Sequence, residues 1–239
     1  MLVKNLTLAC AGVFYASCAI QLLLLRFSKK MRNIMILALL FFSVNAHAVY
    51  NYKNYPWTQT GDKLVAYASV HKDKLLKNAK AIYPRYEQYV PYIREVAAKH
   101  KVPLEIAALA AIESGFNPSA KSPVGAVGMW QFMKPTARDY GLVINSGVDE
   151  RLDWKKSTEA AVTYIKWLAE TRFGNDYETA IMAYNFGIGN MSKAISRAKT
   201  PNAWVLINAN LLPIETEEHL LKFLIYVQIF KYLDIHGVK

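Results

Sequence analysis

The stretch that decides the fold reads VPLEIAALAAIESGFNPSAKSPVGAVGMWQFMKPTARDYG, residues 102–141. From Leu104 to Ile112 it consists mostly of Leu, Ile and Ala without strand-like alternation, which predicts a buried helix. Pro103 suits the first turn of this helix, and Gly115 predicts its end. The predicted helix delivers one carboxylate, Glu113, to the start of a loop rich in Gly, Ser and Pro.

A carboxylate at the inner end of an apolar helix is costly in its charged form, because burial removes it from water. Burial therefore favours the protonated carboxyl group, the form that a general acid needs near neutral pH. For a single Glu, a helix cap or a buried ion pair is the commoner role. The residues around Glu113 decide between these interpretations.

Two blocks of residues carry a resemblance to a known family, and a third supports it. The first block is Glu113-Ser114-Gly115-Phe116-Asn117-Pro118, with Ala120, Ser122, Gly125-Ala126, Gly128-Met129-Trp130-Gln131-Phe132 and Pro135-Thr136-Ala137. The second is Ala183-Tyr184-Asn185-Phe186-Gly187 with Gly189. The third is Leu212-Pro213-Ile214-Glu215-Thr216, in which Ile214 stands where Arg is common.

Over roughly residues 83–233 the chain resembles the lytic murein transglycosylases with a goose-type lysozyme-like (SLT) catalytic domain. Within them it is similar to the membrane-bound lytic transglycosylase D group. Two ordered blocks at the family's spacing make the signal specific. The resemblance implies an all-α, lysozyme-like helical domain over residues 83–236 with a substrate cleft.

The resemblance also implies the site. Glu113 would be the catalytic residue, and substrate-binding residues would be Ser122, Gln131, Met133, Tyr184 and Asn185. The residues themselves leave simpler roles open: Ser122 could only form a turn, Met133 could only fill the core, and the Tyr184 hydroxyl could be satisfied inside the core.

The implied reaction is cleavage of the β-1,4 bond between N-acetylmuramic acid and N-acetylglucosamine in peptidoglycan, with a 1,6-anhydromuramoyl product. Ordinary glycosidases use two carboxylates, whereas the matched blocks supply only Glu113 near the predicted cleft. Asp139 and Asp149 lie outside the matched pattern and are expected at the surface. A single acid/base suggests assistance by the substrate, without a metal or a cofactor.

Other function classes remain open from the sequence. Water as the acceptor would make the protein a lysozyme-type muramidase. A non-catalytic peptidoglycan-binding or secretion scaffold predicts loss of the acid, but Glu113 is present. A membrane-embedded structural protein is suggested only by residues 1–48. The expected partners are peptidoglycan glycan strands, with membrane association through the N-terminus and cell-envelope machinery as further candidates.

The N-terminal 48 residues predict export. Residues 6–25 are nearly all apolar and about long enough to span a bilayer, and a shorter apolar run covers residues 34–44. Met31-Arg32-Asn33 resembles the start of a signal peptide, and Ala46-His47-Ala48 resembles its cleavage site, so a signal peptide over residues 31–48 is expected. The alternative is a membrane anchor over residues 6–25. An acylated Cys18 ranks third. All three interpretations place the domain in the periplasm or cell envelope.

Composition adds weaker constraints. Both cysteines, Cys10 and Cys18, precede residue 49, so the rest of the chain needs no disulfide or thiolate metal site. The net charge is +11, and residues 1–48 hold five basic and no acidic residues, which leaves 11 − 5 = +6. This basic excess suits a carboxylate-bearing polymer, although no nucleic-acid motif accompanies it and nucleic acid is not an expected partner.

The remaining chain predicts further helices. We expect a loose leader over residues 49–60 within an N-terminal extension, 49–82. Helices are expected at 62–83, 91–100, 134–141, 158–173, 176–185 and 216–235, and a further basic helix is expected after Gly189 through Lys199. Ser157 is the expected cap of the helix at 158–173. Residues 143–155, with a solvated Arg151, and 202–214 are expected to be loops.

Overall fold

The computed structural model describes residues 57–58 and 61–237, and the predicted export region, residues 1–48, lies outside them. Helices dominate these described residues, and their only extended pairings are isolated bridges joining Lys121 to Val127, Val127 to Phe132, and Ile144 to Asp149. The predicted all-α class is therefore confirmed. None of the described helices is both long enough and apolar enough to cross a membrane.

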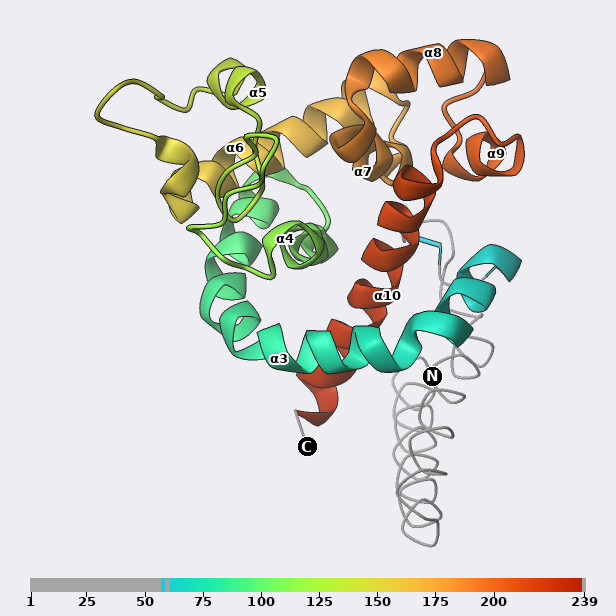
Figure 1. Ribbon diagram of the computed structural model, residues 1–239, viewed down its shortest axis with the longest axis horizontal. Coiled ribbons are helices and arrows are strands. Elements are labelled where there is room, and N and C mark those ends of the chain that lie inside the picture. The colour runs from blue at the N-terminus through green and yellow to red at the C-terminus, as the bar shows by residue number, and fades with distance from the viewer. Residues whose placement is uncertain (1–56, 59–60, 238–239) are drawn as a thin grey trace, which may run out of the picture. The chain divides into compact units, whose positions relative to one another are not determined.

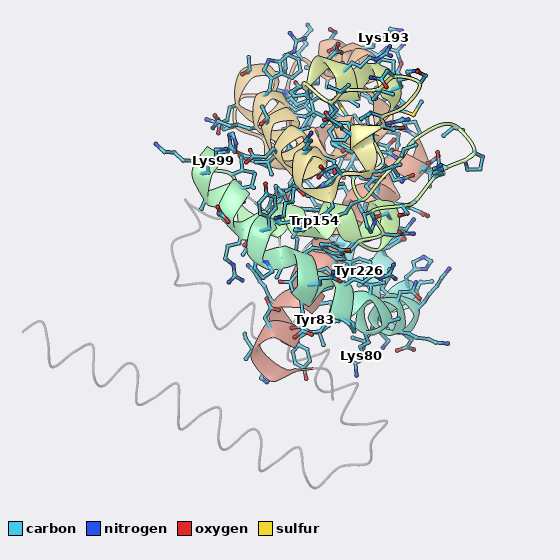
Figure 2. All side chains as sticks on the ribbon, turned by 90° about the vertical axis from the view of Figure 1, so that its left-hand side faces the viewer. Lys80, Tyr83, Lys99, Trp154, Lys193 and Tyr226 are labelled. Atoms are coloured by element: carbon cyan, nitrogen blue, oxygen red, sulfur yellow. The ribbon has the colours of Figure 1, made fainter. Side chains whose placement is uncertain are left out.

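The first long element is a single helix, α3, which spans Asp62–His100 and contains both Pro84 and Pro91. The predicted break into two helices at these prolines is wrong. Both prolines lie on the exposed side of α3, where water can satisfy the carbonyl groups that a proline leaves without an N–H donor. The helix bends instead of ending (Figure 1), and Lys80 and Lys99 mark its two arms in Figure 2.

The predicted buried helix forms as a 3-10 turn, η1 (Leu104–Ile106), that continues into α4 (Ala107–Ser114). Residues Ala107 to Ala111 are all buried, as their composition predicts. Gly115 ends α4 in the left-handed conformation at φ 59°. Helix α4 packs against α3 and α10, and in Figure 1 it lies inside the bend of α3.

A long loop after α4 leads to the short helix α5 (Lys134–Asp139), as expected, and then to a 3-10 turn, η2 (Glu150–Leu152). The prediction that Arg151 is solvated is wrong, because its side chain is only 8% exposed. Its guanidinium donates to the Asp149 carboxylate and to the carbonyl oxygens of Gly125 and Phe132. A side chain with five donors can be buried only where several acceptors converge, and here Arg151 ties the loop to η2.

Helix α6 (Trp154–Lys166) begins earlier than predicted, with Asp153 as its cap. The Asp153 carboxylate accepts from the backbone N–H groups of Lys155 and Lys156. Ser157, the predicted cap, is instead buried within the helix. A π-helical turn, η3 (Trp167–Arg172), extends α6, and α7 (Tyr177–Phe186) follows as predicted, with an Asp176 cap.

Helix α8 (Ile188–Ala198) ends at Lys199 as expected. A short helix, α9 (Ala203–Asn208), forms where a loop was predicted, capped by the side chain of Asn202. The last helix, α10 (Ile214–His236), is buried along most of its length and packs against α3, α4 and α7. Near its end, the Tyr83 and Tyr86 hydroxyls donate to the two oxygens of Asp234 at 2.9 and 2.8 Å.

The expectation of a loose leader over residues 49–60 is wrong at Trp57, which is 4% exposed. Its ring packs against Tyr177 on α7 and Phe223 on α10, with centroids 5.9 and 4.7 Å apart. Thr58 follows it, and its hydroxyl donates to Glu178 on α7. This short segment is thus part of the hydrophobic core.

Candidate active site

Glu113 lies one residue before the end of α4, where the apolar helix meets the loop. Its side chain is 17% exposed, and its Oε1 lies 2.9 Å from Nε2 of His219 on α10, which is 11% exposed. Helices far apart in the sequence therefore bring a carboxyl group and an imidazole together in a largely desolvated position. Among the predicted site residues, Glu113 is the one with an ionisable side chain hydrogen-bonded to a second ionisable side chain.

The loop after α4 is fastened to the helix by Ser114. The Ser114 hydroxyl donates to the carbonyl oxygen of Met129 at 2.7 Å and accepts from the backbone N–H of Asn117. The residue directly after Glu113 therefore holds both the start of the loop, at Asn117, and its later part, at Met129. Such a fixed loop can hold its polar groups in place beside Glu113.

Gly128 allows the loop to lie close against η2. Its φ is 86°, and a Cβ atom at this position would lie 1.9 Å from the carbonyl oxygen of Arg151. Any side chain there would collide with backbone, which cannot move aside as a flexible side chain can. Gly128 and the hydrogen bonds of Arg151 therefore hold the loop against η2.

Ser122 and Gln131 both take part in the structure of this loop. Ser122 forms the turn considered as its simpler role, because its Oγ accepts from the N–H of Ala126 at 2.9 Å. Gln131 has φ 49°, and its side-chain amide donates to the carbonyl oxygens of Gly128 and Ala120, at 2.8 and 3.4 Å. Both side chains stay partly exposed, so they can still contact a ligand.

Tyr184 links α7 to the loop, because its hydroxyl donates to the carbonyl oxygen of Trp130 at 2.7 Å. Burial raises its pKa well above the ordinary value, and the negative charge of Glu113 raises it further. The charge of Glu113 therefore reaches Tyr184, and the contact of Tyr184 with substrate stays a prediction. Its neighbour Asn185 is exposed and accepts from the Thr216 hydroxyl of α10 at 3.0 Å.

The Met133 side chain does not fill the core, because it is 44% exposed just before α5. The simpler role considered for Met133 is therefore wrong. An exposed thioether at the end of the loop is available to pack against a ligand.

Three residues that matter to this site were not singled out from the sequence: His219, Ser114 and Arg151. Ser114 belongs to a matched block, which was a usable signal. His219 is 106 positions from Glu113, and Arg151 lies in a polar segment. Neither has a local pattern that indicates its buried partner.

A recess of about 500 Å³ adjoins the same end of α4. Ile112 and Gly115, the residues that flank the Glu113-Ser114 pair, line it together with side chains of α3 and α10. Its polar and aromatic lining includes Tyr67, His71, Lys74, Glu218, Lys222 and Tyr226. This recess therefore lies next to the Glu113 end of α4, and its lining combines apolar side chains with Lys74, Lys222 and Glu218.

Metal chemistry has no obvious ligand set here. Across residues 57–58 and 61–237, no three His, Cys, Asp or Glu side chains group as they would around a metal ion. A part-buried carboxyl group with an imidazole beside it, such as Glu113 with His219, is an arrangement that can transfer protons.

Comparison with known proteins gives this arrangement a family. Residues 91–207 match the model of the transglycosylase SLT domain. The chain carries a transglycosylase SLT domain. The predicted resemblance is thereby confirmed, and the SLT domain contains Glu113 and all five predicted substrate-binding residues.

Relatives of the SLT domain agree with this assignment. The chain is 34% identical over 175 residues to the membrane-bound lytic murein transglycosylase D of Escherichia coli (strain K12), covering 70% of this chain and 38% of that protein. It is 30% identical over 149 residues to the membrane-bound lytic murein transglycosylase F of Vibrio cholerae, covering 59% and 27%. The chain thus spans well under half the length of these relatives.

Solved structures agree on the fold. The 70-kDa soluble lytic transglycosylase from Escherichia coli superposes with a TM-score of 0.54 at 19% sequence identity, covering 87% of this chain and 36% of that one. A complex of the 70-kDa soluble lytic transglycosylase with bulgecin A gives the same TM-score and identity. The predicted lysozyme-like helical fold is confirmed.

Proposed function

We propose that this protein is a peptidoglycan lytic transglycosylase in which Glu113 is the single acid/base. The observation that carries the proposal is the position of Glu113 at the end of buried helix α4, inside a matched SLT domain, with one carboxylate oxygen held by His219. Both E. coli and V. cholerae relatives are named lytic murein transglycosylases. We propose that the catalytic domain comprises residues 83–236.

In the first step, the protonated Glu113 carboxyl group donates its proton to the glycosidic oxygen between N-acetylmuramic acid and N-acetylglucosamine. The bond from C1 of the muramoyl sugar to that oxygen breaks, and N-acetylglucosamine leaves as an alcohol. The muramoyl N-acetyl group shields the developing positive charge at C1. Positioned proton transfer of this kind contributes about 10²–10⁴-fold in rate.

In the second step, the Glu113 carboxylate takes the proton from the C6 hydroxyl of the same muramoyl sugar. The C6 oxygen bonds to C1 and closes the 1,6-anhydro ring. Glu113 is protonated again, and no water is consumed. Because Glu113 acts first as the acid and then as the base, the reaction needs only one carboxyl group. Ordinary glycosidases use a pair of carboxylates.

We assign substrate contacts to the five residues that the family resemblance implies. Ser122, Gln131 and Met133 belong to the loop and its end, and Tyr184 and Asn185 to the end of α7. Met133 offers an exposed apolar surface for a sugar ring, and the part-exposed Gln131 offers a polar contact beside it. The excess of basic residues after residue 48 favours a polymer that carries carboxylates.

We place the protein in the cell envelope, either released after residue 48 or held by its N-terminal apolar segment. The apolar runs over residues 6–25 and 34–44 support export. The relatives named membrane-bound agree with an envelope location. Envelope machinery is a candidate partner, because an enzyme that opens the cell wall has to act at defined places.

Mass analysis of the products tests this function. Purified murein glycan strands are incubated with the 239-residue chain and, in parallel, with Glu113→Gln. We expect anhydromuramoyl ends from the wild type and none from the variant. Reducing ends would assign the protein to the hydrolases, and binding without cleavage by the wild type would leave a scaffold role. Glu159→Gln, a surface carboxylate on α6, serves as the matched control with full activity.

A further inference from the structure

We propose that His219 is a positioning residue that holds Oε1 of Glu113 and thereby directs the transferable proton to Oε2. The inference deepens the proposed function and rests on it for its kinetic part. His219 lies in the second turn of α10, and Glu113 lies near the end of α4. Their side chains are 2.9 Å apart and mostly buried, so the contact is a defined hydrogen bond.

The second ring nitrogen of His219 indicates which tautomer makes this bond. Nδ1 is buried and has no hydrogen-bond partner within the described residues. A neutral imidazole carries one N–H and one lone pair. An imidazolium would leave a charged N–H buried without an acceptor at Nδ1, which costs more than a buried lone pair. The neutral ring with its proton on Nε2 therefore fits the site, and Nε2 donates to Oε1.

This donation has a chemical consequence for the carboxyl group. An oxygen that accepts from N–H acts as the carbonyl-like oxygen of a protonated carboxyl group, so the acidic proton resides on the other oxygen. Among the described residues, none hydrogen-bonds Oε2 of Glu113. His219 can donate the same hydrogen bond to Glu113 in both of its protonation states. The ring therefore keeps the carboxyl group oriented while Oε2 gives and receives the proton.

A second His–Glu contact in the same protein shows what a purely structural pair is like. His100 and Glu159 are also 2.9 Å apart, but they are 25% and 34% exposed. Lys99 binds the other oxygen of Glu159 at 2.9 Å, so both oxygens have a nitrogen partner. Glu113 differs because only one oxygen is occupied. The His100–Glu159 pair is thus a natural control within the chain.

The titratable groups nearest His219 lie on α10 itself and on the helices packed against it, α3, α4 and α7. On α10 itself, Glu215 lies one turn before it, and Glu218 and Lys222 pair with each other at 3.4 Å. Glu113 faces it from α4, and Tyr184 is close to Glu113 on α7. On α3, Tyr67, His71 and Lys74 line the recess with Glu218 and Lys222.

The kinetic test uses His219→Leu and His219→Gln in the 239-residue chain, with purified murein glycan as substrate. Leu removes the donor, whereas the Gln amide nitrogen can reach the position of Nε2. We expect kcat to fall about 10- to 100-fold in His219→Leu with little change in KM, as for the loss of a hydrogen bond to a charged group. His219→Gln should restore most of kcat, and His100→Leu should leave it unchanged.

Two kinetic results would overturn the inference. One is wild-type kcat in His219→Leu, and the other is an equal loss in a folded His219→Gln variant, because both would mean that the donor does not matter. Circular dichroism and thermal melting identify any variant that fails to fold, and His219→Gln then carries the test.

A direct measurement separates this inference from the proposed function. In spectra of the chain labelled with ¹⁵N-histidine, the signal of His219 is assigned by its loss in His219→Gln. We expect a proton on Nε2, a bare Nδ1 and a change of the signal in Glu113→Gln. A proton on Nδ1 would overturn the inference even in an active enzyme. Failure of the wild type to cleave glycan would overturn the proposed function alone.

Discussion

Two shielded carboxylates in this protein, Glu113 and Glu178, have opposite surroundings. Glu178 is 6% exposed in the first turn of α7, and both of its oxygens are occupied. Its Oε1 accepts from the N–H of Thr58, and its Oε2 accepts from the Thr58 hydroxyl and the Trp204 indole. Glu113 has a single partner, His219, on Oε1.

The difference separates a structural carboxylate from a chemical one. Glu178 joins three segments, the Trp57–Thr58 segment, α7 and α9, and each hydrogen bond fixes it further. Burial raises its pKa, and the hydrogen bonds from Thr58 and Trp204 act in the opposite direction. Glu113 is held on one side only, which fixes its orientation and leaves an oxygen for chemistry. Glu178 is the more deeply buried of the two, so burial alone would single out the structural carboxylate instead of Glu113.

The largest expected effect is on turnover by Glu113→Gln. Because the amide cannot transfer a proton, kcat should fall about 10²–10⁴-fold. The free energy of unfolding should change by less than about 1 kcal/mol, since the carboxylate has only one partner. Glycan turnover and urea denaturation measure the two quantities. If Glu113→Gln kept its turnover, or lost much of its stability, Glu113 would no longer differ from Glu178 as a chemical from a structural carboxylate.

The next largest effect concerns the packing of Trp57 against Tyr177 and Phe223. Trp57→Ala should lower the free energy of unfolding by about 3–5 kcal/mol, the range for a buried aromatic side chain. Trp167→Ala, at a side chain that is 37% exposed, is the matched control with a small effect. Denaturant melts compare the two variants. Equal stabilities would mean that the segment before α3 is not part of the core in solution.

Glu178→Gln should destabilise without slowing the folded enzyme. The amide keeps one acceptor but turns an NH₂ group toward donors of Thr58 or Trp204. An unsatisfied buried donor costs about 1–3 kcal/mol, so the unfolding midpoint should drop while kcat stays near the wild-type value. A variant with normal stability and lost turnover would reverse the roles of the two carboxylates.

The smallest effect is the pH dependence of stability at Glu178. Because burial raises its folded pKa above the unfolded value near 4.3, its contribution is fully present below that value. The contribution is lost as the pH rises through the folded pKa. The wild type should therefore lose stability relative to Glu178→Gln over this pH window. A difference between the two melts that stays flat with pH would contradict the raised pKa.

Much of the fold could be predicted because its signals are local. The Leu, Ile and Ala run of α4, its Gly115 end and the apolar faces of α10 are legible from residue type alone. Helix α3 was mispredicted at Pro84 and Pro91, since a proline on the exposed side of a helix can bend it without ending it. Helix α9 was missed because its six residues follow an Asn cap that looks like a turn.

The site was predictable only where chemistry and sequence neighbours coincide. Glu113 stands inside a matched block, but the pairing with His219 depends on the packing of α10 against α4. The burial of Arg151 depends likewise on carbonyl groups of Gly125 and Phe132, which lie 26 and 19 residues away. Long-range acceptors of this kind leave no mark in a local pattern.

The most direct test of the account is a crystal structure of Glu113→Gln bound to a murein tetrasaccharide. The account predicts that the glycosidic oxygen lies within about 2.6–3.2 Å of the outer side-chain atom of residue 113, the one that does not contact His219. This distance is the reach of proton transfer. The inner atom should contact His219, and Glu178 should keep its hydrogen bonds from Thr58 and Trp204. A glycan bound away from residue 113, or an inner atom turned away from His219, would contradict the account.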